Sequence, residues 1–342
     1  MRTQEKINMF GFLFCGFVIF IATETVLNKY SEYILPSEHY LKKSIDCFEK
    51  IQDEINIIFL GHSQVYYGIN PAYIKLSNKY KVHNFAFVSE PIETNYYKLS
   101  YYLQKRGLKN LKLVVIDASS IINEATLNTV FEYSRYYNYL DILFNHRYNL
   151  FLTAMVSKSN IIRLKPIITN INFSFSTSSL RYFIDNEHLL DNGYCKREYS
   201  FTESQFKSEI QNYIKWDQEE KLYPDPIKLR YLNRLISTLH NRKINVIFIL
   251  PPVPTLHLCQ RGQYNSLITN HKKHDFCKLK IQQILKNIYP DIPVFNYNDP
   301  NKSIGFTLQH FSDRGHLNYR GSKLLSTKIS NDLELYFKNT NN

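Results

Sequence analysis

The stretch Ile55-Asn-Ile-Ile-Phe-Leu-Gly-His-Ser63 decides the fold of this chain of 342 residues. The run that ends at Leu60 is nearly all apolar, which is typical of a short strand buried on both faces of a sheet. Gly61 then allows a sharp turn, and Ser63 stands at the start of the segment that follows. Ligands bind at the carboxyl ends of the strands in open parallel sheets, so this turn is the first candidate for chemistry.

Three further apolar runs predict the rest of a parallel sheet. Residues 111–116 and 246–250 each follow an amphipathic stretch with helical spacing, roughly 92–106 and 227–241, and Val294–Asn296 is the last run. Strands that alternate with helices favour a three-layer α/β/α domain, in which helices cover both faces of the sheet.

Other segments are expected to be helical. The sequence predicts helices over residues 37–53, from Pro71 behind an Asn70 cap, and over 319–337. The region from about 121 to 225 is aromatic and polar and lacks the spacing of strands. We therefore expect a helical insertion there, lying over the sheet.

The N-terminus carries an apolar run. Residues 9–22 (MFGFLFCGFVIFIA) are all apolar or glycine, and their neighbours extend the run to a length that is marginal but sufficient for a membrane span. A cleaved secretory signal and a buried core helix are the alternatives, although the run ends in Thr-Glu-Thr-Val without a clear cleavage site. Arg2 and Lys6 precede the run and point the N-terminus to the cytoplasm. We expect a cytoplasmic N-terminus and transmembrane anchor in residues 1–28, and one α/β domain in residues 29–342 facing the periplasm or the cell exterior.

Composition excludes few functions. Lys and Arg exceed Asp and Glu by 12, but the excess is scattered and forms neither a basic stripe nor a nucleic-acid-binding module, so no nucleic-acid partner is expected. Residues 271–277 contain metal-binding residue types, yet a polar helix start or loop explains them more simply. The sequence predicts no metal and no cofactor.

Ser63 needs a base, because a serine hydroxyl ionises far above neutral pH and histidine is the side chain best suited to take its proton. Asp313-Arg-Gly-His316 lies in a polar loop after the last predicted strand. A carboxylate at this spacing can reach Nδ1 of His316 and leave Nε2 free for the serine proton. Each motif alone is a weak signal, since a helix cap would explain Ser63 and a surface histidine would explain His316.

Together with their surroundings, the two motifs resemble the SGNH/GDSL hydrolase family. Residues 57–71 (IIFLGHSQVYYGINP) are similar to the first block of the family, and residues 311–321 (FSDRGHLNYRG) are similar to its last block, in which Asp and His complete a catalytic triad. The resemblance spans about 55–335 apart from the insertion. It is strongest to the membrane-anchored envelope branch that includes D-alanyl transfer and polysaccharide O-acetylation proteins, and it implies a flavodoxin-like sheet.

The chain departs from the family pattern beside the nucleophile and in the second block. His62 stands where the family usually has Asp or Ser, and it either lines the pocket or faces solvent. The nearest match to the glycine of the second block is Asn84-Phe-Ala86. The resemblance implies that backbone N–H groups of Ser63 and Ala86 hold the oxyanion, because a backbone donor does not need glycine.

The third block also differs, since its oxyanion Asn is missing and the corresponding strand ends in Asp117-Ala-Ser-Ser120. Either Ser119 or Ser120 substitutes, or the oxyanion hole lacks one donor. The candidate pocket residues are therefore His62, Asn84, Ser119 and Ser120.

The resemblance implies a serine esterase or O-acyltransferase that adds or removes acyl groups, acetyl first among them, on a cell-surface glycan. Ser63 would form the acyl-enzyme, His316 would move the proton, and Asp313 would orient His316. A membrane-bound O-acyltransferase is the implied partner. The alternative is a non-catalytic, membrane-tethered binding or assembly protein on a degenerate form of this fold, which the altered second and third blocks favour.

Overall fold

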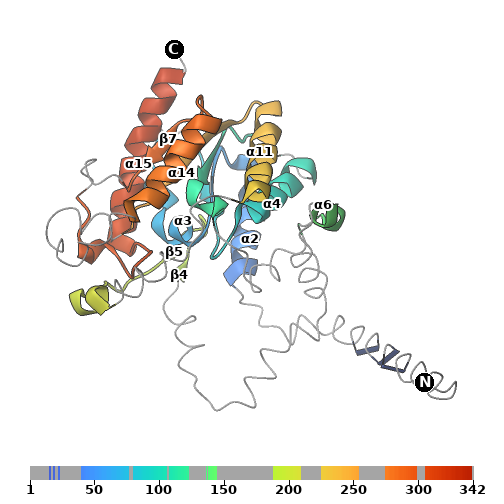
Figure 1. Cartoon of the computed structure of the whole chain (residues 1–342), viewed down its shortest axis with the longest axis horizontal. Coiled ribbons are helices and arrows are strands. Elements are labelled where there is room, and N and C mark those ends of the chain that lie inside the picture. Colours follow the sequence, from blue (N-terminus) through green and yellow to red (C-terminus); the bar gives the residue numbers. More distant parts are fainter. Residues whose placement is uncertain are drawn as a thin grey trace.

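A five-stranded parallel sheet forms the centre of the molecule (Figure 1). Its strands lie in the order β2-β1-β3-β6-β7, with bounds β1 (Ile57–Leu60), β2 (Val82–Asn84), β3 (Leu113–Asp117), β6 (Asn245–Leu250) and β7 (Val294–Asn296). The computed structural model describes residues 15–16, 18–19, 22–23, 40–76, 80–105, 108–122, 136, 138–144, 188–208, 225–253, 274–298 and 305–340. The predicted α/β fold with a parallel sheet is confirmed.

Helices lie on both sides of this sheet (Figure 1). They are α2 (Tyr40–Ile51), α3 (Ser63–Gly68), α4 (Ile92–Lys105), α6 (Tyr139–Phe144), α11 (Pro226–Asn241), α14 (His274–Ile288) and α15 (Tyr319–Thr340). Single 3-10 turns are η1 (Gln52–Glu54), η2 (Pro71–Tyr73), η3 (Ala118–Ile121) and η5 (Leu308–His310). Helices α4 and α11 pack against each other, and α15 packs against α3.

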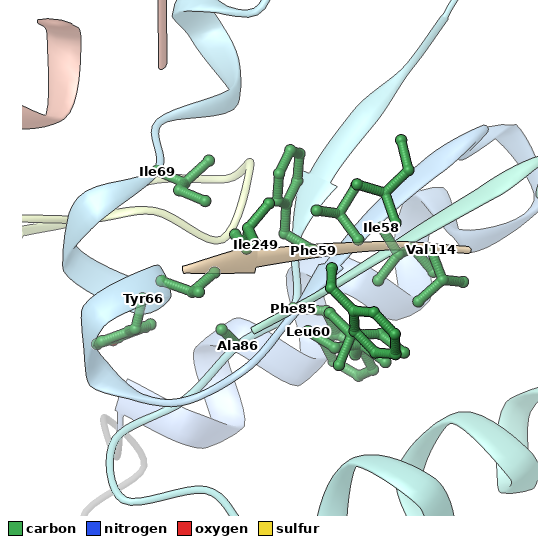
Figure 2. Packing of buried hydrophobic residues seen from close by; sticks show 14 of the residues in the cluster. Ile58, Phe59, Leu60, Tyr66, Ile69, Phe85, Ala86, Val114 and Ile249 are labelled. Atoms are coloured by element: carbon green, nitrogen blue, oxygen red, sulfur yellow. The ribbon is translucent and has the colours of Figure 1, made fainter. Parts of the chain in front are cut away.

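The strands carry near-continuous apolar runs because both of their faces are covered. All residues of β1 and β3 are buried, and Ile58 of β1 lies beside Val114 of β3 in the parallel register. Figure 2 shows these side chains together with Ile249 of β6 in one core. At the end of β1 the chain passes so close to β3 that a Cβ on Gly61 would lie 2.5 Å from the Cβ of Asp117. Glycine is therefore required at this turn.

Three features of the sheet and its flanks differ from the expectations. Strand β2 was not expected, because Val-His-Asn is too short and too polar to stand out as a strand. Helix α14 was also missed. The helix expected from Pro71 is only the 3-10 turn η2, although Asn70 caps it as expected, with its Oδ1 accepting the N–H of Ala72 at 3.0 Å.

The expected helical insertion at 121–225 is described only in part. Its described residues include the short helix α6 and an antiparallel hairpin of β4 (His188–Leu189) and β5 (Cys195–Lys196). The described part of the insertion thus contains a hairpin that was not expected, beside a short helix. The predicted anchor at 9–22 lies almost wholly outside the described residues, and no helix among the residues that are described is long and apolar enough to cross a membrane.

Candidate active site

Ser63 is the first residue of α3, directly after β1 and the turn at Gly61-His62. Its half-buried hydroxyl oxygen lies 2.7 Å from Nε2 of His316, although the two residues are 253 positions apart in the chain. Nδ1 of His316 lies 2.8 Å from Oδ2 of Asp313. The structure thus places the three residues that the sequence assigned to one site in a continuous hydrogen-bonded row.

The loop that carries Asp313 and His316 is held by its own backbone. Oδ1 of Asp313 accepts the N–H groups of Gly315 at 2.8 Å and of His316 at 2.9 Å. Phe311 and Leu317 form an antiparallel bridge that closes the loop at its base. Because these bonds fix the carboxylate relative to the ring, the orientation of His316 does not depend on a mobile side chain.

His62 neither faces solvent nor stands free in a pocket. Its buried ring places Nε2 2.8 Å from Oγ of Ser119 and 3.1 Å from Oδ2 of Asp117. Nδ1 accepts the N–H of Gln64 at 3.3 Å and caps α3, so the ring hydrogen is on Nε2. Nδ1 also lies 3.5 Å from Oγ of Ser63, at the limit of a hydrogen bond.

Asn84 and Ala86 have structural partners. The side chain of Asn84 is fully buried and donates to the carbonyl oxygens of Val65 and Ile69, both at 2.8 Å. Its Oδ1 accepts the N–H of Ala86 at 3.1 Å. Asn84 therefore braces α3 rather than lining a pocket, and the N–H expected to hold the oxyanion from Ala86 is already engaged.

Ser119 and Ser120 also differ from each other. The hydroxyl of Ser119 donates to Oδ1 of Asp117 at 2.6 Å and lies against His62, so it is committed to that cluster. The hydroxyl of Ser120 is buried and has no hydrogen-bond partner among the described residues. The N–H of Ser63 likewise has no acceptor in the part of the chain that the structure describes.

Arg197 is a site residue that sequence reasoning missed. It follows β5, and its Nη1 donates to Oδ2 of Asp313 at 2.6 Å. The guanidinium carbon lies 3.7 Å from the centre of the Tyr67 ring, and the rings of Tyr67 and His316 are nearly perpendicular with their centres 5.3 Å apart. Burial alone would raise the pKa of the Asp313 carboxyl, but His316 and Arg197 hold it well below its usual range. The carboxylate is therefore ionised at neutral pH.

The described residues contain no group of three or more His, Cys, Asp or Glu side chains that could hold a metal ion. Of the stretch 271–277, residues 271–273 and the side chains of the rest lie outside the described part.

Comparisons with known proteins add little. No protein-family model and no curated protein matches the sequence. One similar solved structure, provisionally named a platelet activating factor from Streptococcus pneumonia, has 11% identity, covers 90% of this chain and 99% of that one, and has a TM-score of 0.38. Another, provisionally named an acylhydrolase from Bacteroides fragilis, has 10% identity, covers 85% and 98%, and has a TM-score of 0.34. Similarities this low carry no information about function.

Proposed function

We propose that this chain is a serine esterase or O-acyltransferase of the SGNH type, with Ser63 as nucleophile, His316 as general base and Asp313 as the group that orients His316. One observation carries the proposal. Nε2 of His316 lies 2.7 Å from Oγ of Ser63, while Nδ1 of the same ring is held 2.8 Å from Asp313. This is the geometry that a serine nucleophile and its base require.

The reaction would proceed in two transfers. Oγ of Ser63 attacks the acyl carbonyl carbon while its proton passes to Nε2 of His316, and Asp313 stabilises the imidazolium through Nδ1–H. The tetrahedral intermediate expels the alcohol, which takes the proton from Nε2, and leaves an acyl ester on Ser63. Water or a sugar hydroxyl then gives its proton to Nε2 and attacks the ester. Collapse releases the acyl product and returns the proton to Ser63.

Of the two backbone donors that the resemblance implies for the oxyanion hole, one is already engaged. The N–H of Ser63 supplies one donor, but the N–H of Ala86 donates to Asn84 at 3.1 Å. A site with one donor fewer loses about 10²- to 10³-fold in rate. This engagement favours the second candidate, a non-catalytic binding or assembly protein that kept the fold and the serine–histidine geometry.

We extend the proposal to the cell envelope and to glycans on the basis of the sequence resemblance and the apolar run at 9–22. The substrate would be an acyl ester, acetyl foremost, of a cell-surface glycan. The domain would face the periplasm or the exterior behind a single-pass anchor in the inner membrane, and a membrane-bound O-acyltransferase would supply acyl groups.

The test is acyl-enzyme formation on the full chain. The protein is incubated with a fluorophosphonate probe and with p-nitrophenyl acetate, beside Ser63→Ala and the matched control Ser204→Ala, which removes an exposed serine outside the site. We expect labelling and ester turnover in the wild type and in Ser204→Ala, and neither in Ser63→Ala.

A folded wild-type chain that neither labels nor turns over ester would favour the non-catalytic candidate. Labelling that persists in Ser63→Ala would exclude Ser63 as the nucleophile.

A further inference from the structure

Arg197 is a nearly buried charged side chain of the site that the proposed reaction does not use. Its side chain is only 10% exposed, and its Nη1 lies 2.6 Å from Asp313, 3.3 Å from Nδ1 of His316 and 3.4 Å from the hydroxyl of Ser312. Tyr67 covers the guanidinium with its ring face. A buried charge is costly unless it is paired and hydrogen-bonded, so this placement is held by specific contacts.

The backbone at Arg197 and after it is joined to the loop that carries Asp313 and His316. The carbonyl oxygen of Arg197 accepts the N–H of Tyr319 at 2.8 Å, at one end of the loop. Four residues further on, the N–H of Phe201 donates to the carbonyl oxygen of Phe311 at 2.8 Å, at the other end. The segment after β5 therefore fixes Arg197 relative to Asp313.

Two hydrogen-bond donors, Arg197 and His316, share the Asp313 carboxylate. Oδ2 faces both Arg197 at 2.6 Å and Nδ1 of His316 at 2.8 Å. Arginine cannot accept a hydrogen bond, so the Nδ1 hydrogen of His316 must point to Asp313 rather than to Arg197. A cation this close to the pair disfavours a second positive charge on the imidazole.

Other titratable and charged groups also lie around Asp313 and His316. Tyr67 lies on α3 and contacts both Arg197 and His316, and His62 precedes α3 and faces Ser63. Tyr199 follows β5, with its ring centre 5.8 Å from the guanidinium carbon. Arg314 is exposed in the loop itself. Burial alone would lower the pKa of Arg197, but Tyr67 and Asp313 raise it above its usual value.

We propose that Arg197 is a positioning residue that fixes the Asp313 carboxylate and, by sharing its charge, sets the lower pH limit at which neutral His316 can accept the proton of Ser63. The inference rests on the proposed function. Arg197 lies in the insertion at about 121–225, so this part of the insertion would help to hold the active site in place.

The experiment measures kcat/KM for p-nitrophenyl acetate from roughly pH 5 to pH 9, because this profile reports the free enzyme's essential groups. The variants are Arg197→Gln, Arg197→Lys and the matched control Arg320→Gln, an exposed arginine whose Nε donates to the hydroxyl of Tyr319. Thermal unfolding establishes that each variant is folded.

In Arg197→Gln the low-pH limb of the kcat/KM profile should move to higher pH by roughly one unit, because Asp313 then stabilises the protonated His316 ring without competition from Arg197. Arg197→Lys keeps the charge but not the planar guanidinium that packs on the Tyr67 ring. Its acid limb should stay within a few tenths of a unit of the wild type, while its plateau falls by about tenfold. Arg320→Gln should match the wild type in both respects.

A folded Arg197→Gln whose acid limb coincides with that of the wild type would overturn the inference. Should Arg197→Gln fail to fold, Arg197→Lys decides, because a wild-type plateau and limb in that variant would equally overturn it. An inactive wild type would count against the proposed function instead, so the two failures are distinguishable.

Discussion

Two histidines, each with a carboxylate partner, lie beside the hydroxyl of Ser63. His316 belongs to a half-buried loop and presents Nε2 at 2.7 Å, with Asp313 behind Nδ1. His62 belongs to the buried turn before α3 and presents Nδ1 at 3.5 Å, with Asp117 behind Nε2. The same chemical groups thus stand on two sides of one hydroxyl.

The difference lies in what the nitrogen near Ser63 already binds. Nδ1 of His62 accepts the N–H of Gln64, which ties its lone pair to the start of α3. Among the described residues, the partner of Nε2 of His316 is Ser63. An aspartate–histidine pair near a serine is therefore insufficient evidence for a base. The lone pair that Nε2 of His316 presents to Ser63 is the reason that the proposed reaction uses His316 as the proton acceptor, whereas His62 caps α3 beside Ser63.

The largest expected effect comes from removing each imidazole. His316→Ala should lower kcat/KM for p-nitrophenyl acetate by on the order of 10⁴-fold, because the serine loses its base. His62→Ala should lower it by only about tenfold, through loss of the α3 cap and slight displacement of Ser63. Steady-state ester hydrolysis measures both, with thermal unfolding as the control for folding.

Equal losses of kcat/KM in folded His316→Ala and His62→Ala would contradict the different roles given to the two histidines, because His62 would then take part in proton transfer. A larger loss in His62→Ala would reverse the two assignments.

Asp313 and Asp117, the carboxylate partners of the two histidines, should also differ in their effect on activity. Asp313→Asn should lower kcat by about 10³-fold, because an amide can donate to Nδ1 and favour the wrong tautomer, and it should also lower stability because Arg197 loses its carboxylate partner. Asp117→Asn should destabilise the fold by about 1–3 kcal/mol but change kcat by less than about tenfold. Asp117 accepts both the N–H and the hydroxyl of Ser119, so its role is to join β3 to η3 and His62.

Chemical denaturation and steady-state kinetics on the two Asn variants separate these effects. If Asp117→Asn lost activity while keeping its stability, the distinction between a structural and a catalytic pair would be wrong.

The sequence predicted the sheet where strands are buried on both faces, because such strands carry uninterrupted apolar runs. This held for β1, β3 and β6, whose residues are buried almost throughout. It failed for β2, whose buried His83 and Asn84 give no apolar pattern. Asn84 is polar because it braces α3 through bonds that only the folded structure reveals.

The site residues likewise divide into those that a local sequence motif reveals and those whose role depends on distant partners. Ser63, Asp313 and His316 lie in local motifs that can be recognised from neighbouring residues. Arg197 has no such motif, because its partner Asp313 is 116 positions away and its place depends on the docking of β5. The orientation of His62 depends on Ser119, 57 positions away, so the sequence left its role open.

A third histidine allows a further comparison, because among the described residues no carboxylate is hydrogen-bonded to its buried ring. His83 on β2 is fully buried, and neither ring nitrogen has a hydrogen-bond partner among the described residues. Burial first, and then the nearby Lys98 and Lys81, lower the pKa of His83 to about 3. The ring is therefore neutral in the folded protein across the pH range in which the unfolded chain takes up a proton near pH 6.5.

This shift makes the fold less stable as pH falls from about 6.5 towards 3, because the unfolded state binds the proton and the folded state does not. The loss should reach roughly 2 kcal/mol at about pH 5. In His83→Leu, this part of the pH dependence should disappear, while Asp313 keeps its own contribution, which is lost only under more acidic conditions. Chemical denaturation of both proteins at about pH 7.5 and pH 5 measures the difference. Parallel losses in the two proteins would mean that His83 has a partner that keeps it protonated, and the contrast with the two carboxylate-bound rings would no longer hold.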